Sequence, residues 1–169
     1  MLAAHDTGAR VHQREYDYQP APQEWEEPYK ARREAFGDSL YRGALGILPM
    51  DTKRRVAHHR RNYEFFGAPV GIFLTVSRNP RDGAMVDAGI FLQALMLAAR
   101  GEGLDTCPQA SWLDFFPVIR EHLDVPEDQV IICGLALGYA DHEHLANGVR
   151  TQRAPTSAWV KFYGDGRRD

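Results

Sequence analysis

The chain has 169 residues, of which 44% are hydrophobic and 11% aromatic, so we expect one domain with a core over residues 1–169. Its 20 Lys and Arg against 23 Asp and Glu give a formal charge of -3, which excludes a general electrostatic attraction for nucleic acid or for an anionic membrane. Two cysteines are too few for a disulfide framework and favour a reducing compartment.

The first 28 residues predict little regular structure. Residues 1–5 are typical of the end of a helix, and because no capping residue precedes them we expect that earlier sequence is missing. Residues 7–28 are rich in Pro, Gln and Tyr and predict a long irregular segment. The start lacks the pattern of a secretory signal, and no run of eighteen apolar residues occurs. These features predict a soluble cytoplasmic protein.

Two helices are predicted next. Residues 29–45 carry apolar side chains at helical spacing and end before Pro49. Asp51 is a suitable N-cap for a second helix over residues 52–66, which has a basic face. We interpret that face as solvated, the alternative being contact with nucleic acid or a nucleotide phosphate.

A buried strand and a long apolar helix follow. Residues 70–76 form a short run of branched and aromatic side chains and predict the strand. From 84 to 100, apolar residues surround the predicted helix on nearly every side, and Gly101 and Gly103 end it. A domain of this size cannot easily bury such a helix alone, so we expect it at the core of a dimer.

The last predicted elements are a helix and a second strand. Ser111 or Asp114 can cap a helix that runs to His122, and residues 129–138 predict a buried strand. Mixed helices and strands indicate an α+β fold. Because two strands make no stable sheet, a third is expected in a segment such as 157–163, in a partner chain, or before Met1.

Two loops carry the residue types of a binding site. The first, Gly103 to Ser111, holds Cys107, Pro108, Gln109 and Ala110 in an extended turn whose backbone groups can face a ligand. It is also compatible with an ordinary connection between a helix and a strand.

The second loop, residues 147–155, contains Arg150 and Arg153 after Asn147. Two arginines three residues apart can hold one phosphate by forked, charge-assisted hydrogen bonds. Arginines on a surface also serve solubility alone, and that alternative stays open.

Other candidates favour structural roles. The histidines of 58–59 and 142–144 lack a third ligand at metal-binding spacing, so no metal site is expected. Cys107 has no neighbouring base, which indicates a passive thiol. The aromatic residues Trp25, Tyr29, Phe36 and Tyr41 suit either a flat substrate or packing, and Trp159, Phe162 and Tyr163 suit an arm that packs on a partner subunit.

Taken in order, four segments resemble the nitroreductase family: FFGAPV at 65–70, GLDTCPQA at 103–110, GLALGYAD at 134–141 and ANGVRTQRAP at 146–155. The resemblance implies the FMN-dependent nitroreductase fold and a homodimer with FMN at the subunit interface. It places Cys107, Pro108, Gln109 and Ala110 against the flavin ring, and Arg150 and Arg153 near its phosphate.

The same resemblance implies a reaction. NADH or NADPH would give a hydride to the flavin and leave, and a small nitroaromatic or quinone-type acceptor would then bind in its place. No side chain need act as an acid or base, and residues 16–29 would shape the acceptor pocket. Neither metal, nucleic acid nor membrane is implied.

The sequence departs from the family in one respect. It contains neither the family's Arg-Arg-Ser-type motif, which binds the FMN phosphate, nor its Gln-Pro-Trp segment beside the ring. Each missing charged hydrogen bond to the phosphate would cost about 1.5–3 kcal/mol. The alternative hypothesis is therefore an N-terminally truncated, flavin-free and inactive nitroreductase-like protein.

Overall fold

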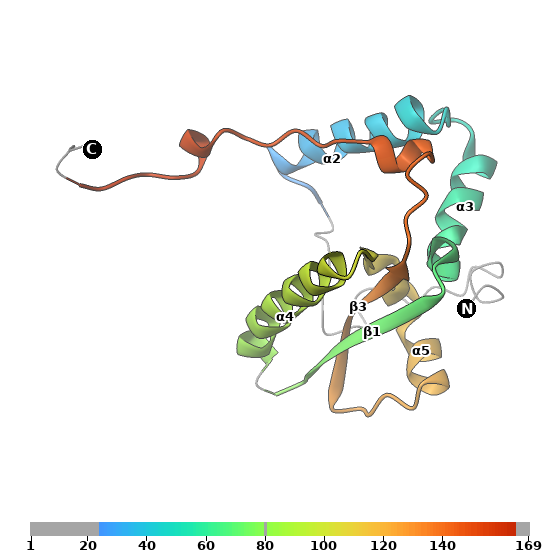
Figure 1. The fold of residues 1–169 in the computed structure, drawn as a ribbon, viewed down its shortest axis with the longest axis vertical. Coiled ribbons are helices and arrows are strands. Elements are labelled where there is room, and N and C mark those ends of the chain that lie inside the picture. The colour runs from blue at the N-terminus through green and yellow to red at the C-terminus, as the bar shows by residue number, and fades with distance from the viewer. Residues whose placement is uncertain (1–23, 80, 165–169) are drawn as a thin grey trace.

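The computed structural model describes residues 24–79 and 81–164, apart from the side chains of 81 and 82. Three antiparallel strands form a sheet in the order β1-β3-β2, with β3 in the centre. They are β1 (Val70–Ser77), β2 (Asp105–Gln109) and β3 (Gln129–Gly138). Helices surround this sheet, as the α+β prediction requires (Figure 1). The helix end expected at residues 1–5 lies outside the described residues. So does the part up to residue 23 of the irregular segment and of the residues expected to shape the acceptor pocket.

The two faces of the sheet are covered by different elements. The long helix α4 (Arg81–Gly101) packs on one face, where Ile72 and Leu135 lie opposite each other in register. On the other face lies the 3₁₀ turn η4 (Ala110–Phe115), followed by α5 (Phe116–His122). Figure 1 shows α4 and α5 on opposite sides of the strands.

The core lies between the sheet and the elements around η4. Its aromatic centre is Tyr63, whose ring meets Trp112 and Phe115 edge-on at centroid distances of 5.5 and 5.0 Å, a favourable arrangement for aromatic pairs. Phe115, Val130 and Ile131 are fully buried. The buried strand β3 therefore joins the sheet to this core.

The first helices of the chain lie away from the sheet, as Figure 1 shows at the top of the molecule, and the last segment before β1 returns to it. They are α2 (Tyr29–Gly37), the π-helical η2 (Asp38–Ala44), α3 (Thr52–Arg60) and the 3₁₀ segment η3 (Arg61–Gly67). The predicted N-cap is confirmed, since the Asp51 carboxylate accepts the Arg54 N–H at 3.2 Å. The predicted helix over 52–66 is α-helical only to Arg60 and continues as the 3₁₀ segment, in which Phe65 and Phe66 have φ angles of 49° and 54°, outside the right-handed helical region.

Two further expectations are corrected by the structure. A third strand does lie within the chain, as one of the alternatives held, but it is β2 and not residues 157–163, which contain only the end of a short 3₁₀ turn, η6 (Thr156–Ala158). Neither Ser111 nor Asp114 caps α5, which starts at Phe116 without a side-chain cap. The chain instead enters α5 through η4, with Pro117 in the first turn, where its missing N–H costs nothing.

Helix α4 is buried on one side only. Ala88 and Ala99 face the sheet and are buried, whereas Val86, Ile90 and Leu97 are 64%, 65% and 63% exposed in the single chain. By length and composition, the part from Gly83 to Gly101 could also cross a membrane, but core helices of soluble proteins pass the same test. The expected burial of α4 on all sides would thus require a second apolar surface to cover the side that carries Val86, Ile90 and Leu97.

The segment after β3 contains the 3₁₀ turn η5 (Leu145–Gly148), which packs against η2. Beyond it the chain runs in an extended conformation away from the sheet (Figure 1). Its aromatic residues are strongly exposed, with 73% for Trp159 and 83% for both Phe162 and Tyr163.

Candidate functional site

The predicted ring-binding residues lie at the edge of the sheet. We expected Cys107, Pro108 and Gln109 in a loop, but they lie in strand β2. Ala110 begins η4. Because β2 pairs with β3 on one side only in the described sheet, its other side presents backbone N–H and C=O groups that no described strand takes up. These groups can meet the edge of a flat polar ring.

A glycine turn fixes where β2 begins. After α4, the Leu104 N–H bonds the Ala99 carbonyl at 2.9 Å and the Gly103 N–H bonds the Arg100 carbonyl at 3.1 Å. This pair of bonds is a Schellman motif, which needs a residue with positive φ, and Gly103 has φ 76°. The predicted glycine stop is confirmed, and it delivers the chain directly into the edge strand.

The Gln109 side chain points into the protein and not towards the free edge. The residue is only 4% exposed. Its amide nitrogen donates to the Asn62 backbone and side-chain oxygens, both at 3.1 Å, and its amide oxygen accepts from the Trp112 indole at 3.4 Å. Gln109 therefore offers a ligand only its backbone, while its side chain fastens β2 to η3 and η4.

Cys107 is exposed, yet burial of its thiol raises the pKa of Cys107 above the ordinary value. The thiol also lies 3.9 Å from the Pro108 carbonyl oxygen, to which it can donate. Both features favour the protonated thiol, which is not a nucleophile. The structure agrees with a passive Cys107.

Arg150 and Arg153 lie in the segment after η5. Arg150 Nη1 donates to the carbonyls of Asn147 at 2.8 Å and Val149 at 3.3 Å, and Arg153 donates to the hydroxyl and carbonyl of Thr151. Within the described part of the chain, the hydrogen bonds of both arginines stay in their own segment. The structure thus does not bring the arginines into contact with Cys107 to Ala110, and their remaining donors are available to a phosphate.

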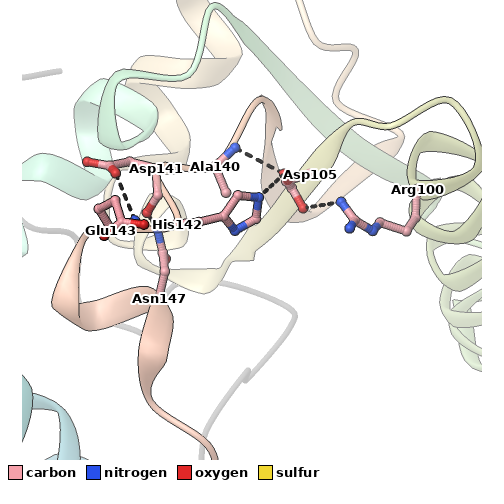
Figure 2. Close-up of polar contacts among 7 residues, drawn as sticks. All are labelled: Arg100, Asp105, Ala140, Asp141, His142, Glu143 and Asn147. Atoms are coloured by element: carbon pink, nitrogen blue, oxygen red, sulfur yellow. Dashed lines mark hydrogen bonds and ion pairs between the residues drawn. The ribbon is translucent and has the colours of Figure 1, made fainter.

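One residue that the sequence analysis did not select connects the two regions. Asp105, the first residue of β2, accepts from Arg100 at 2.8 Å and from the Ala140 N–H at 3.0 Å, and its carboxylate lies 3.9 Å from His142 Nε2 (Figure 2). Its signal in the sequence is an acidic residue two positions after the glycine helix stop at Gly103, but its partner at 140 is 35 residues away.

An apolar groove of about 520 Å³ runs between the last turns of α4 and the sheet. Its lining includes Ile72, Leu95, Leu104, Thr106, Leu135 and Leu137. These side chains lie on the sheet face opposite Gln109, and because most of them are apolar the groove favours apolar groups.

The other candidates are dispersed. Trp25 and Tyr29 each stack with an arginine, at 5.5 and 5.6 Å, while Tyr41 packs edge-on against His58 at 5.7 Å. They build no common aromatic pocket among the described residues. Residues 24–79 and 81–164 also contain no group of three or more His, Cys, Asp or Glu side chains that could hold a metal ion.

The chain is similar to known proteins in sequence and in structure. The model of the nitroreductase family matches residues 9–139. A 4-nitrobenzoate reductase of Nocardioides sp. (strain LMS-CY) is 50% identical over 98% of this chain, and one of Pseudomonas putida is 38% identical over 85%. The chain spans only 66% and 63% of the lengths of these two relatives.

Solved structures match as well. The FMN-dependent nitroreductase NfnB from Mycobacterium smegmatis, determined in complex with NADPH, has a TM-score of 0.87 at 31% identity, over 96% of this chain and 71% of that one. The FMN- and NADPH-dependent nitroreductase NfnB from sphigopyxis sp. strain HMH has a TM-score of 0.86 at 33% identity, over 96% of this chain and 72% of that one. The fold is therefore that of these nitroreductases.

Proposed function

Because the chain belongs to the nitroreductase family, we propose that it is an FMN-dependent NAD(P)H oxidoreductase that reduces nitroaromatic or quinone-type acceptors. Two relatives are named 4-nitrobenzoate reductase, which makes 4-nitrobenzoate the first acceptor to test. We place this activity in the cytoplasm, in keeping with a chain that has few cysteines.

The observation that carries the proposal is the edge of β2 at Cys107 to Gln109, which pairs with no further strand among residues 24–79 and 81–164. The pyrimidine edge of a flavin carries alternating carbonyl oxygens and ring nitrogens, and a strand edge offers N–H and C=O groups to them, except that Pro108 has only its C=O. The buried side chain of Gln109 holds that edge in place from behind. The residues present thus fit the polar edge of the ring.

Arg150 and Arg153 supply charge for the phosphate. Guanidinium groups suit a phosphate because they donate two parallel hydrogen bonds, and the donors of both arginines are used only by neighbouring carbonyl and hydroxyl oxygens in the described structure. In this proposal the bound FMN supplies the hydride and electron chemistry. The chain's own residues bind and orient it, and the donor and the acceptor occupy the same place in turn.

We also propose that a second copy of the chain covers α4. The exposed apolar side chains of α4 and of the C-terminal arm are too large a surface for a soluble monomer to leave open. Val86, Ile90, Phe91 and Leu97 would meet the second copy, and Trp159, Phe162 and Tyr163 would pack on it. A second copy would also bury the side of α4 that is exposed in the single chain, as expected for a helix that is apolar on nearly every side.

The test is flavin retention. Purified protein is incubated with FMN, separated from the excess and examined for the visible absorbance of bound flavin, and then for NADPH oxidation that depends on 4-nitrobenzoate. We expect the double variant Arg150→Ala, Arg153→Ala to lose most of the flavin, and Arg42→Ala, an arginine paired with Asp38 on η2, to retain it. A colourless wild-type protein would overturn the function, and unchanged flavin in the double variant would overturn the assignment of the arginines.

A further inference from the structure

Asp105 has an unusual position between three parts of the chain. One carboxylate oxygen accepts from Arg100 near the end of α4, and the other accepts from the backbone N–H of Ala140, beyond the end of β3 (Figure 2). Asp105 itself is the first residue of β2, where it pairs with Gly138, the last residue of β3. One side chain thus fixes the point at which the chain leaves the sheet.

The three contacts of Asp105 differ in weight. The Arg100 and His142 side chains are 62% and 71% exposed, so solvent screens both, and His142 is also 3.9 Å away. The Asp105 side chain is only 28% exposed, and its bond to the Ala140 N–H is charge-assisted and joins two backbone segments. The bond to Ala140 is therefore the contact that fixes geometry.

Further bonds carry this geometry to Arg150. The Asp141 carbonyl, next along the chain, accepts from the Asn147 side chain at 2.7 Å and from the His144 N–H at 3.1 Å. The Asn147 carbonyl in turn accepts from the Arg150 guanidinium at 2.8 Å. Figure 2 shows Asp105, Ala140, Asp141 and Asn147 along this path. Three hydrogen bonds and the η5 turn connect Asp105, at the start of the edge strand, to the Arg150 guanidinium.

We propose that Asp105 is a positioning residue, which sets where the phosphate-binding Arg150 lies relative to the ring-binding edge of β2. The inference rests on the proposed function and deepens it. FMN must be bound at its ring and at its phosphate at the same time. The proposed ring-binding edge of β2 and the proposed phosphate-binding Arg150 belong to segments that share no direct hydrogen bond in the described structure. Asp105 is the link that makes the spacing between them definite.

The experiment separates the two ends of the ligand. Riboflavin has the ring and ribityl chain of FMN without the phosphate, so the ratio of the two dissociation constants measures the contribution of the phosphate. Dissociation constants for both are determined by flavin fluorescence quenching for wild type, Asp105→Ala and Asp105→Asn. Arg100→Gln is the matched control, because it removes the exposed ion pair and leaves the bond to Ala140.

We expect Asp105→Ala to reduce the preference for FMN over riboflavin by about tenfold, the loss that goes with one misplaced charge-assisted hydrogen bond. Asp105→Asn keeps an acceptor for the Ala140 N–H and should retain most of the preference, as should Arg100→Gln. In the Asp105→Ala background, Arg150→Ala should cause little further loss of FMN affinity, because its phosphate contact is already gone.

The outcomes are distinct. Equal weakening of FMN and riboflavin, or fully additive effects of Asp105→Ala and Arg150→Ala, would show a merely structural Asp105 and overturn the inference while the proposed function stands. A wild-type chain that binds neither flavin overturns the proposed function and this inference with it. If Asp105→Ala does not fold, Asn147→Ala cuts the same path in an exposed turn, and an unchanged preference for FMN there overturns the inference.

Discussion

The indole of Trp112 lies where a side chain of residue 134 would otherwise be. A Cβ atom on Gly134 would stand 2.5 Å from Trp112 Cδ1, closer than packed atoms approach. The same arrangement recurs one strand away, where a Cβ on Gly71 would meet the Phe65 ring at 2.2 Å. Phe65 and Trp112 lie against each other with centroids 4.4 Å apart. Two glycines of neighbouring strands thus let one pair of aromatic rings lie flat on the sheet.

Gly134→Ala should lower the free energy of unfolding by about 1–3 kcal/mol, because the added methyl group forces the buried indole to move. Gly37→Ala is the control, since a Cβ there meets nothing within 4 Å and Gly37 has helical backbone angles. That variant should leave stability unchanged or raise it slightly. Urea unfolding followed by circular dichroism measures both, and equal stabilities of the two variants would contradict the tight contact.

Gln109→Leu should lower the free energy of unfolding by about 1–3 kcal/mol, because it leaves the Trp112 indole N–H without its acceptor in the core. Gln109→Glu keeps that acceptor but loses the donor to Asn62, and it also places a charge on a residue that is 4% exposed. Both should therefore be less stable than Gln152→Leu, a change at an exposed position. A Gln109→Leu protein as stable as wild type would mean that the side chain does not fasten β2.

The sequence predicts some elements of this fold well and others poorly, for physical reasons. The strand predicted over residues 129–138 has the same ends as β3 in the structure. A short continuous apolar run bounded by turn residues is compatible with few secondary structures other than a buried strand. β2 is missed because Asp105 and Pro108 have low strand propensity and the strand is only five residues long. Its conformation comes from pairing with β3, for example of Thr106 with Leu137. Because the two residues are 31 positions apart, the local sequence around β2 does not reveal this pairing.

The candidate site divides in the same way. The position of Cys107 to Ala110 after the helix stop follows from local chemistry, because Gly103 alone can provide the positive φ of the turn. The role of Asp105 does not, since its partner Ala140 is brought close only by the sheet. The burial of Gln109 is equally non-local, for it depends on Asn62 in η3. Sequence patterns therefore select the residues of the proposed site, and the fold shows which further residues contact them.

Cys107 should react slowly with a maleimide at pH 7, and faster as the pH rises, because burial raises the pKa of its thiol and only the thiolate reacts. Cys133 is buried and should react only in denaturant. Cys107→Ser and Cys133→Ser assign the two reactions by mass spectrometry. Rapid labelling of Cys107 at pH 6 would contradict the passive thiol.

Ile90→Glu should convert the proposed dimer to monomers. The variant places a carboxylate on the exposed apolar side of α4, where the interface would bury it without a partner, at a cost of about 3–5 kcal/mol. Leu123→Glu, which adds the same charge beyond α5 at a comparably exposed residue, should leave the assembly intact. Sedimentation velocity of the three proteins tests this. A wild-type chain that sediments as a monomer would exclude the interface.

The thermal stability of the protein should fall as the pH decreases below about 6.5, in part through His58. Its ring packs between Tyr41 and Phe66, and the pKa of His58 is lowered from 6.5 by burial and, to a smaller extent, by the nearby charges of Arg61 and His144. A lowered pKa means that the unfolded chain takes up the proton first. Stability is therefore lost as the pH falls from about 6.5 to the pKa of the folded state, and the loss ends below it.

His58→Phe keeps an aromatic ring between Tyr41 and Phe66 and removes the titration, so it should flatten the dependence of Tm on pH over this range. His122→Gln removes an exposed histidine at the end of α5 and serves as the control, with a slope close to that of wild type. Because the two changes alter the histidine count equally, a difference between them reports the surroundings of His58 and not the total charge. Parallel Tm curves for wild type and His58→Phe would show that the ring titrates alike in the folded and unfolded chain.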